Sequence, residues 1–402
     1  MASSNSYSSE GQYLERAQEF ELLRRPLPTL SSDDVLIEPR AVTLCGSDNH
    51  YFQKACNGSI KIREPLCLGH EFAGKIVDVG SGVRDRKIGD RVAIEPGVAC
   101  AECDVCRNGR YNLCANLRFR GSGSAWPHFQ GGLQEKVVHP AAWTHKYNEV
   151  LTAKRLPPEL TYEEGALIEP LAVAVHACRR ANIKPGSSCI VIGAGAVGLL
   201  CAVAARLEGC TRITIADIVE SRINFAVNHG FAQAGFLVPG KRHSDPTEQL
   251  HAAADIAKSL GQVKFPDGLP VDRADYVLEC TGVEVCTQTS VYATKAGGKT
   301  VIVGMGTPNH NLPLSHAGAR EIDIISIWRY ADCYPRAIEI MQESKRNESV
   351  ANIAQMITHR FEGLANVPAA FHCASRSQDE SGRMVIKVVV STKDPGDIEI
   401  DC

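Results

Sequence analysis

The sequence predicts an α/β protein in which a doubly wound parallel sheet is inserted into a β-rich domain. Three observations predict this fold class. The chain has 402 residues, enough for two or three domains. Short alternating apolar and polar runs fill its first part, whereas wholly apolar strands alternate with helix-like stretches in its middle. The first texture returns near the end, so the first and last segments are expected to pair.

The first segment, residues 1–170, is expected to form an antiparallel, barrel-like β domain. Its strands are predicted near 35–37, 74–80 and 90–94, where glycine and proline separate short alternating runs. The returning segment, residues 316–402, is expected to add a late helix at 335–345 and a closing strand at 384–390.

The middle segment, residues 171–315, reads as the parallel sheet with its helices. Strands that are buried on both faces are nearly continuous apolar runs. Such runs occur at 189–192, 212–216, 276–279 and 300–303. The polar stretch 239–272 is expected to be a surface excursion, which could contain a helix at 247–260.

Composition excludes several classes of protein. The 43 basic and 46 acidic residues leave a net charge of −3, which argues against a nucleic-acid-binding protein. The apolar run at 190–205 is shorter than the roughly 20 residues that cross a bilayer, so no membrane partner is expected. The serine-rich first ten residues show no signal sequence, and a cytoplasmic location is therefore expected.

A glycine motif follows the first apolar strand of the middle segment and precedes a helix-like run. Gly193, Gly195 and Gly198 fit Gly-x-Gly-x-x-Gly. The first allows a tight turn, the second lets a pyrophosphate approach the backbone, and the third packs helix on strand. Asp217 ends the next strand, where its carboxylate would accept ribose hydroxyls and repel the 2′-phosphate of NADP. The motif predicts NAD binding; Arg222 could pack on adenine, pair with Asp217 or be a solvated surface residue.

Four cysteines cluster in a lobe at residues 95–116: Cys100, Cys103, Cys106 and Cys114. Four thiolates with short spacers can wrap one tetrahedral Zn²⁺ and leave no open position, which predicts a structural role. An iron–sulfur cluster is the alternative, but the longer last gap and the lack of a following proline disfavour it. A nucleic-acid-binding zinc knuckle is not favoured either, because the surrounding charges balance.

A second, open metal site is suggested by Cys45, His70 and Glu71. One thiolate, one imidazole and one carboxylate make a plausible catalytic zinc site, with a fourth position for water or substrate. Each residue also has an ordinary interpretation, as a core cysteine or a turn pair, so spacing alone leaves the metal open.

Together these motifs resemble the zinc-containing medium-chain dehydrogenases, from about residue 30 to 390. The resemblance rests on Cys-Gly-Ser-Asp at 45–48, Gly-His-Glu at 69–71, the four-cysteine lobe, the glycine motif and the run 163–171. Within that family, residues 168–171, 176–180 and Arg329-Tyr330 are similar to the branch of sorbitol (L-iditol), xylitol and L-arabinitol dehydrogenases.

The resemblance implies a GroES-like catalytic domain, a Rossmann NAD-binding domain and a homotetramer. Cys45, His70 and Glu71 match the catalytic zinc ligands. Glu169 matches a glutamate beside that zinc, and the sequence leaves open whether Glu71 or Glu169 binds it directly or through water. The matched polyol contacts are Tyr51, Glu169, Arg329 and Tyr330, and Phe119, at the start of the long loop 118–131, could also face the substrate. The matched NAD contacts are Val197, Asp217, Arg222, Val303, Gly304, Met305, Ile327, Trp328 and Arg329.

The implied reaction oxidises a polyol to the corresponding ketose. Zinc would act as a Lewis acid on the substrate hydroxyl, and hydride would pass to NAD. Ser47 and His50 are candidates to carry the released proton outward, although His50 could equally be a surface imidazole. Arg329 and Tyr330 would grip outer hydroxyls, so that a simple alcohol would leave their polar groups unmatched.

Other functions stay open on the sequence alone. The chain could be a zinc-dependent secondary-alcohol or L-threonine dehydrogenase of the same family, which a substrate panel separates. A zinc-free NADPH quinone reductase is disfavoured by Cys45, His70 and Asp217. A non-enzymatic dinucleotide-binding protein is disfavoured because every expected zinc ligand is present.

Overall fold

The computed structural model describes residues 7–147, 160–240 and 244–393. The chain divides into two units, Met1–Glu169 with Ala354–Cys402, and Pro170–Ile353. The second unit is thus inserted into the first, and each is described by itself. The sequence placed the return to the first unit at residue 316. In the structure the inserted unit runs on to Ile353, because β18 (Asp323–Ser326) pairs with its sheet and α10 (Tyr334–Arg346) follows.

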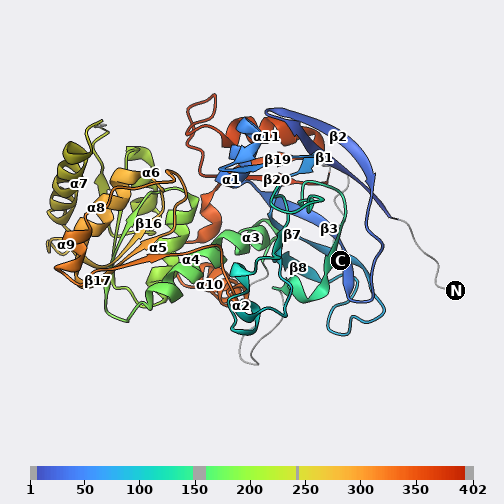
Figure 1. The fold of residues 1–402 in the computed structure, drawn as a ribbon, viewed down its shortest axis with the longest axis horizontal. Helices are drawn as coiled ribbons and strands as arrows, with labels where there is room; N and C mark the ends of the chain where they lie inside the picture. The colour runs from blue at the N-terminus through green and yellow to red at the C-terminus, as the bar shows by residue number, and fades with distance from the viewer. Residues whose placement is uncertain (1–6, 148–159, 241–243, 394–402) are drawn as a thin grey trace. The chain divides into compact units, whose positions relative to one another are not determined.

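A seven-stranded sheet is the framework of the first unit (Figure 1). Its order is β12-β8-β7-β3-β20-β19, with β11 also paired to β3, and every pair except β19–β20 is antiparallel. Because β20 pairs with β3, the first and last segments of the chain share this sheet. Its strands are β3 (Asp34–Thr43), β7 (Glu71–Val79), β8 (Arg91–Ile94), β11 (Val137–Pro140), β12 (Thr144–Lys146), β19 (Ile357–Glu362) and β20 (Lys387–Ser391).

Smaller elements surround this sheet. Three more sheets are formed by β1 (Ser8–Arg16) with β2 (Glu19–Pro26) and β6 (Leu66–Cys67), by β4 (Cys56–Asn57) with β5 (Ile60–Lys61), and by β9 (Gly97–Val98) with β10 (Arg118–Phe119). The helices are α1 (Gly46–Lys54), α2 (Asp104–Arg107), α3 (Tyr162–Ala166) and α11 (Val367–Ala374), with 3₁₀ turns η1 (Tyr111–Leu113), η2 (Ala141–Trp143), η3 (Ile353–Met356) and η4 (Leu364–Asn366).

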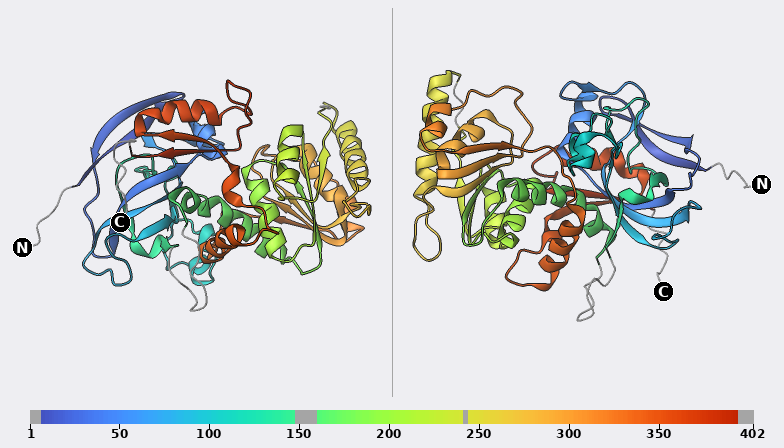
Figure 2. Two further views of the ribbon diagram at one scale, coloured as in Figure 1. Left: turned by 180° about the vertical axis from the view of Figure 1, so that it is seen from behind. Right: turned by 60° about the horizontal axis from the view of Figure 1, so that its bottom comes forward.

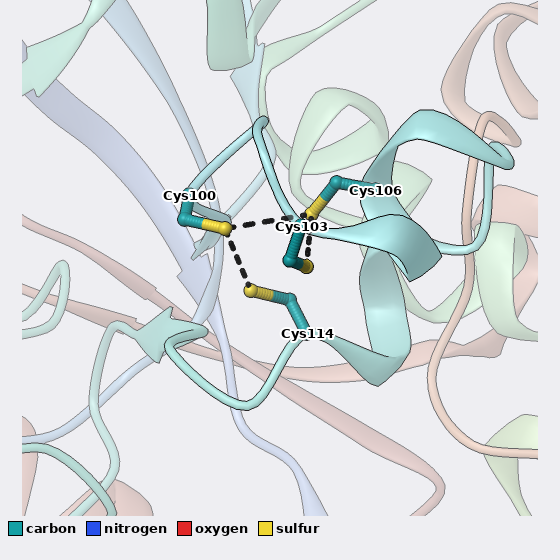
Figure 3. Close-up of side chains that lie close together, drawn as sticks. All are labelled: Cys100, Cys103, Cys106 and Cys114. Atoms are coloured by element: carbon teal, nitrogen blue, oxygen red, sulfur yellow. Dashed lines mark hydrogen bonds between the residues drawn. The ribbon is translucent and has the colours of Figure 1, made fainter.

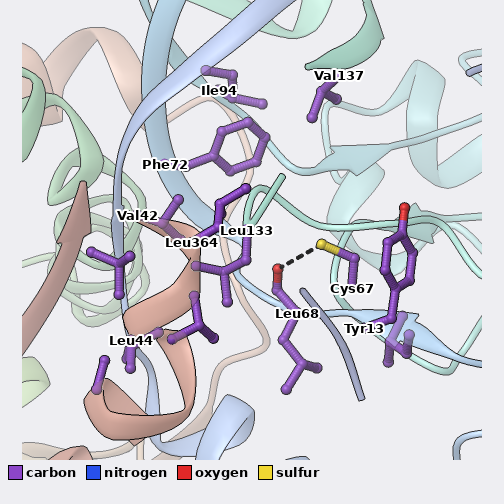
Figure 4. Packing of buried hydrophobic residues seen from close by; sticks show 14 of the residues in the cluster. Tyr13, Val42, Leu44, Cys67, Leu68, Phe72, Ile94, Leu133, Val137 and Leu364 are labelled. Carbon is purple, nitrogen blue, oxygen red and sulfur yellow. Dashed lines mark hydrogen bonds between the residues drawn. The ribbon is translucent and has the colours of Figure 1, made fainter. Parts of the chain in front are cut away.

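A hydrophobic core holds the segment that leads into β7 (Figure 4). Leu68 and Phe72 are almost completely buried in this core, and they flank His70 and Glu71 in the sequence. Gly69 between them has φ +87°, and a Cβ there would lie 2.6 Å from Cγ1 of Val42. Only glycine fits this close approach without strain. The core therefore fixes the backbone on which His70 and Glu71 stand.

The second unit is a parallel, doubly wound sheet, as the sequence predicts. Its order is β15-β14-β13-β16-β17-β18, with α7, α8 and α9 on one face and α4 and α5 on the other (Figures 1 and 2). The strands are β13 (Ser188–Ile192), β14 (Arg212–Asp217), β15 (Ala234–Leu237), β16 (Ala274–Glu279), β17 (Thr294–Ile302) and β18. The helices are α4 (Ile168–Ala181), α5 (Ala196–Leu207), α6 (Glu220–Asn228), α7 (Pro246–Gly261), α8 (Glu284–Ala293), α9 (Leu314–Gly318) and α10.

The structure also tests the helix left open at 247–260 and the closing strand expected at 384–390. The polar excursion contains α7, which covers the helix considered at 247–260. The closing strand starts at Lys387 rather than at residue 384, because Gln378 and Met384 form a separate bridge before it. Among the described residues, no helix combines the length and the apolar character that crossing a membrane requires.

Candidate metal sites and dinucleotide site

The four-cysteine lobe brings its sulfurs together around one point (Figure 3). Cys103 is the N-cap of α2, Cys106 lies within α2, and Cys114 follows η1. The sulfur–sulfur distances are 3.4 Å for Cys103–Cys106, 3.5 Å for Cys100–Cys114 and 3.9 Å for Cys100–Cys106. Tetrahedral ligands at a Zn–S distance of about 2.3 Å lie about 3.8 Å apart. The cage therefore fits one Zn²⁺.

Charge explains why this cage needs a cation. Hydrogen bonds from the backbone N–H groups of Glu102 and Cys103 lower the pKa of Cys100 to about 6, which favours its thiolate. Desolvation and hydrogen bonds with the neighbouring thiols raise the pKa of Cys106 to about 12. Four thiolates so close together would repel one another, and a divalent cation at their centre removes that repulsion.

The open metal site is also assembled in the first unit. One ligand atom each from Cys45, His70 and Glu71 lies within 4.8 Å of the others. Cys45 is the N-cap of α1, whereas His70 and Glu71 come from the entry to β7. A sulfur, a nitrogen and an oxygen donor suit zinc, and three protein ligands leave one position for water or substrate. The donor set fits a catalytic zinc.

Asp48 organises two of these ligands and was missed by the sequence analysis. Its buried carboxylate accepts hydrogen bonds from the backbone N–H of Cys45 at 3.1 Å and of Gly69 at 3.3 Å. It also lies 3.3 Å from Nδ1 of His70. Burial alone would lower the pKa of His70, but the Asp48 charge and hydrogen bond raise it well above its ordinary value. Nδ1–H therefore donates to Asp48, and Nε2 is left for a metal.

A buried lysine holds the third ligand. Oε2 of Glu71 accepts hydrogen bonds from the Thr43 hydroxyl and, at 2.5 Å, from Nζ of Lys387. Nζ also donates to the Leu44 carbonyl at 3.1 Å. Burial alone would lower the pKa of Lys387, but the charges of Glu71 and Cys45 raise it, so the side chain is a cation. Both contacts go to one oxygen, which leaves Oε1 of Glu71 for a metal.

The other predicted residues of the first unit lie on α1 and near the start of α4. Glu169, near the start of α4, is 5% exposed, and its charge helps to raise the pKa of Lys387. It does not belong to the cluster of three candidate ligands. Ser47 is partly exposed and His50 is exposed, with its Nδ1 3.2 Å from the Asn57 side chain. Tyr51 is buried, and its hydroxyl accepts a hydrogen bond from Gly123 N–H at 3.1 Å.

In the long loop 118–131, Phe119 lies beside His70, a candidate zinc ligand. Its ring centroid lies 5.4 Å from that of His70. Ser122 of the same loop lies 3.3 Å from the Tyr51 hydroxyl, so the loop is tied to α1. The ring of Phe119 therefore lies beside a candidate zinc ligand, and its match to a substrate-facing position stays a prediction of the resemblance.

The glycine motif of the second unit has the geometry of a phosphate cradle. Gly193 has φ +104°, and a Cβ on Gly198 would lie 1.8 Å from the carbonyl oxygen of Gly193. A Cβ on Gly195 would meet nothing within 4 Å, so its backbone is open to a ligand. Asp217, at the end of β14, accepts hydrogen bonds from Ala194 N–H at 2.7 Å and Val219 N–H at 2.9 Å. These contacts place its carboxylate beside the motif.

Of the remaining predicted residues of the second unit, Val197 lies in α5 and Arg222 in α6, and the others lie in the segments that follow β17 and β18. Trp328 is 38% exposed and the Arg329 guanidinium lies over its ring, 5.1 Å from the centroid. Arg329 has φ +51°, a conformation that costs free energy for a residue with a side chain and is common at functional sites. Tyr330 is buried against Tyr334. The other positions vary in exposure: Met305 is exposed, whereas Val197, Arg222, Val303, Gly304 and Ile327 are partly buried.

Comparison with known proteins gives the class of this protein. Residues 31–149 match the family model of the alcohol dehydrogenase GroES-like domain, and residues 196–343 match that of the zinc-binding dehydrogenases. An Escherichia coli oxidoreductase of unknown specificity superimposes with a TM-score of 0.79 at 30% identity, covering 96% of this chain and 100% of that one. The chain belongs to the zinc-containing medium-chain dehydrogenases and is an oxidoreductase.

Its relatives place it further within that family. It is 37% identical to chicken sorbitol dehydrogenase, over 90% of this chain and 92% of that protein. It is 35% identical to a grapevine L-idonate 5-dehydrogenase, over 87% of each chain. It is 34% identical to L-arabinitol 4-dehydrogenase of Penicillium rubens, over 91% of this chain and 88% of that protein. The resemblance to the polyol branch that the sequence suggested is confirmed.

Proposed function

We propose that this protein oxidises a polyol to a ketose, using a catalytic zinc and NAD. The observation that carries the proposal is the cluster of Cys45, His70 and Glu71, which offers three different donor atoms and an open fourth position. The relatives named sorbitol and L-arabinitol dehydrogenase support a polyol as the substrate.

The residues of the first unit would hold the metal and move the proton. Zinc, when bound, supplies the Lewis acidity that lowers the pKa of a substrate hydroxyl. Asp48 keeps Nε2 of His70 available, and Lys387 offsets part of the negative charge that Cys45 and Glu71 contribute. Less negative charge from the ligands leaves the metal a stronger acid. Ser47 and exposed His50 would pass the proton to water.

The polar side chains that the resemblance matched to polyol contacts would hold the substrate. Arg329 and Tyr330 would bind outer hydroxyls, and Glu169 would bind a hydroxyl or a water on the metal. The Tyr51 hydroxyl already forms hydrogen bonds with Ser122 and Gly123. Tyr51 would therefore hold the loop 118–131 in place as well as contact the substrate. A polyol satisfies these groups, whereas a simple alcohol leaves them unpaired.

NAD is the proposed dinucleotide, and one structural and one catalytic zinc per chain are proposed. Asp217 supports NAD because its carboxylate, fixed beside the glycine motif, would repel a 2′-phosphate. A related dehydrogenase from Sinorhizobium meliloti, 28% identical with a TM-score of 0.76, was solved with NADP, so the preference needs a test. Replacing Asp217 with Ser should raise the ratio of kcat/KM for NADP to that for NAD at least tenfold, and an unchanged ratio would contradict the assignment.

A substrate panel tests the activity. Purified protein should reduce NAD fastest with sorbitol, xylitol or L-arabinitol, and slowly with 2-butanol or L-threonine. L-idonate belongs in the panel because the grapevine relative carries that name. Cys45→Ser should abolish turnover and leave NADH binding nearly intact. Full activity in that variant would show that the catalytic zinc is assigned to the wrong residues.

A cytoplasmic homotetramer is proposed as the working state. The described cysteines are all free thiols, which agrees with a reducing compartment. Light scattering of the purified protein tests the tetramer, and fractionation of the source cells tests the location.

A further inference from the structure

A buried acid that the proposed reaction does not use stands at the carboxyl end of a central strand of the second unit's sheet. Glu279 is the last residue of β16, and its side chain is 0% exposed. β16 lies beside β13, whose carboxyl end carries the glycine motif. Ligands of open parallel sheets bind at the carboxyl ends of the strands. Glu279 therefore stands where a ligand is expected, although no sequence motif points to it.

The carboxylate of Glu279 ties down the loop that follows it. Oε1 accepts hydrogen bonds from the backbone N–H of Thr281 at 2.7 Å and from the Thr281 hydroxyl. The N–H of Gly282 lies 3.1 Å from Oε1 and 3.0 Å from Oε2. Burial raises the pKa of this carboxyl group, whereas the hydrogen bonds from Thr281 and Gly282 favour its charged form. One side chain thus sets the path of residues 280–282.

The backbone of Glu279 also holds a second loop, residues 303–305, beside the first. Its carbonyl oxygen accepts hydrogen bonds from Val303 N–H at 2.8 Å and Gly304 N–H at 2.9 Å. The two loops touch through glycine backbones: a Cβ on Gly304 would lie 2.2 Å from the nitrogen of Gly282. No side chain fits between them, so a shift of one loop moves the other.

The first of these loops also touches the phosphate cradle. Cγ2 of Thr281 would be 2.9 Å from a Cβ on Gly193, the first glycine of the motif. The second loop leads to exposed Met305, and Val303 to Met305 are the positions matched to NAD contacts. Glu279 is therefore connected to the glycine motif on one side and to a second set of candidate cofactor contacts on the other.

The strand order tells which half of a dinucleotide these loops would meet. All strands are parallel, but the order in which they are added reverses between β13 and β16, and each half of such a fold binds one mononucleotide. Asp217 ends β14 and belongs to the half expected to hold the adenosine. Glu279 ends the first strand of the other half, which is left for the nicotinamide mononucleotide.

We propose that Glu279 is a positioning residue for the nicotinamide half of the cofactor. It holds the loops 280–282 and 303–305 in the arrangement that this half needs, without touching the reacting atoms. This inference rests on the proposed function, because it requires that the chain bind NAD. It assigns a role in cofactor binding to a buried carboxylate that otherwise reads as part of the core.

The test compares two ligands that differ in their second half. NADH and AMP are titrated against the zinc-loaded wild-type protein and Glu279→Gln, with fluorescence for NADH and competition for AMP. The amide cannot accept all the hydrogen bonds of the carboxylate, so the Kd for NADH should rise about tenfold or more. The Kd for AMP should stay within about twofold, because AMP occupies the half with Asp217. Equal weakening of both ligands, or of neither, would overturn the proposal.

A pair of milder variants keeps the proposal testable if Glu279→Gln does not fold. Thr281→Val removes the hydroxyl donor to Glu279 and should weaken NADH about threefold, the value of one ordinary hydrogen bond. Thr281→Ser keeps that hydroxyl and should bind NADH like the wild type. Thr281→Val binding as tightly as Thr281→Ser would also contradict the proposal.

A matched control and the wild type separate this inference from the proposed function. Glu208→Gln makes the same change at the C-cap of α5, the end of that helix farther from the glycine motif. Glu208 pairs there with Arg336 at 2.9 Å. It should leave the Kd for NADH unchanged. A wild-type protein that binds no NADH would refute the proposed function itself. A wild type that binds NADH and oxidises a polyol, with an unaffected Glu279→Gln, would refute only the role of Glu279.

Discussion

Nζ of Lys387 lies 2.5 Å from Oε2 of Glu71, and the two side chains are 3% and 1% exposed. A buried charge is costly unless it is paired, so each of these residues needs the other. Glu71 is also a candidate metal ligand, and the pair therefore links the stability of the first unit to the charge of its metal centre.

Removing the lysine charge should destabilise the protein strongly. Lys387→Met leaves the Glu71 carboxylate buried with one hydrogen bond fewer, and breaking one side of a buried pair costs about 3–5 kcal/mol. The melting temperature of the zinc-loaded protein should fall by about 5 °C or more. Lys393→Met is the control, because Lys393 pairs with Glu38 at 3.6 Å and is partly exposed. Equal melting temperatures for the two variants would show that the buried pair contributes little.

Replacing Asp48 should weaken zinc binding at the open site. Asp48→Asn keeps the size of the side chain but removes the charge that fixes Nδ1–H of His70, so Nε2 is no longer held for the metal. Loss of such a partner typically lowers metal affinity about 10- to 100-fold. Chelator competition with zinc counting measures it, and one zinc per chain should be lost at much lower chelator concentration.

The exposed Asp104 of the cysteine lobe provides the control for that experiment. Its side chain is 97% exposed, and Asp104→Asn should hold both zinc ions like the wild type. If Asp48→Asn also resists the chelator, the hydrogen bond to His70 does not support metal binding.

Strands and helices of the second unit were predictable because each is a local pattern. Wholly apolar runs such as 189–192 mark strands that are buried on both faces, and the structure has β13 there. The end of the unit was not predictable in this way. β18 is an edge strand of the sheet with partly exposed residues, so its sequence does not stand out as a buried strand.

The candidate ligands were predictable, but the residues that hold them were less so. Cys45, His70 and Glu71 are chemically distinctive and lie in short motifs. Lys387 is 316 residues from Glu71 in sequence, and only the pairing of β20 with β3 and of β3 with β7 brings them together. A lysine within an apolar strand was a signal, since such a residue rarely faces a core without a partner. Asp48 gave a weaker signal, as the N3 residue of a capping box.

The cysteine lobe should lose its own zinc independently of the open site. Cys106→Ser removes one of four ligands from a closed cage, so the zinc content should fall from two to one per chain. NADH binding should be retained, because the glycine motif lies in the other unit. Limited proteolysis should then cleave near residues 100–114, which depend on the metal for order.

Cys373→Ser serves as the comparison, because Cys373 belongs to neither cluster. It should keep two zinc ions and resist the protease. A Cys106→Ser protein with two zinc ions would show that the fourth sulfur is not a ligand.

His139 should make the stability of the protein fall in mild acid. The side chain is 0% exposed, accepts a hydrogen bond at Nδ1 from Arg120 at 2.9 Å, and has Nε2 3.1 Å from the Glu95 carbonyl. Burial, and then the charge of Arg120, lowers its pKa well below 6.5, so it is neutral when folded. Below pH 6.5 the unfolded chain takes up a proton that the folded chain does not.

This difference fixes the sign and the window of the effect. The contribution of neutral His139 to the free energy of unfolding is fully present above the pKa of this histidine in the unfolded chain. As the pH falls below that value, the free energy of unfolding decreases by up to about 1.4 kcal/mol per pH unit. Between pH 7 and 5 the loss is about 2 kcal/mol, which should lower the melting temperature by about 3 °C or more. His139→Gln cannot take up the proton, so its melting temperature should change less over the same range. Because both proteins carry the same other titrating groups and metal sites, equal falls in the two would show that His139 does not contribute.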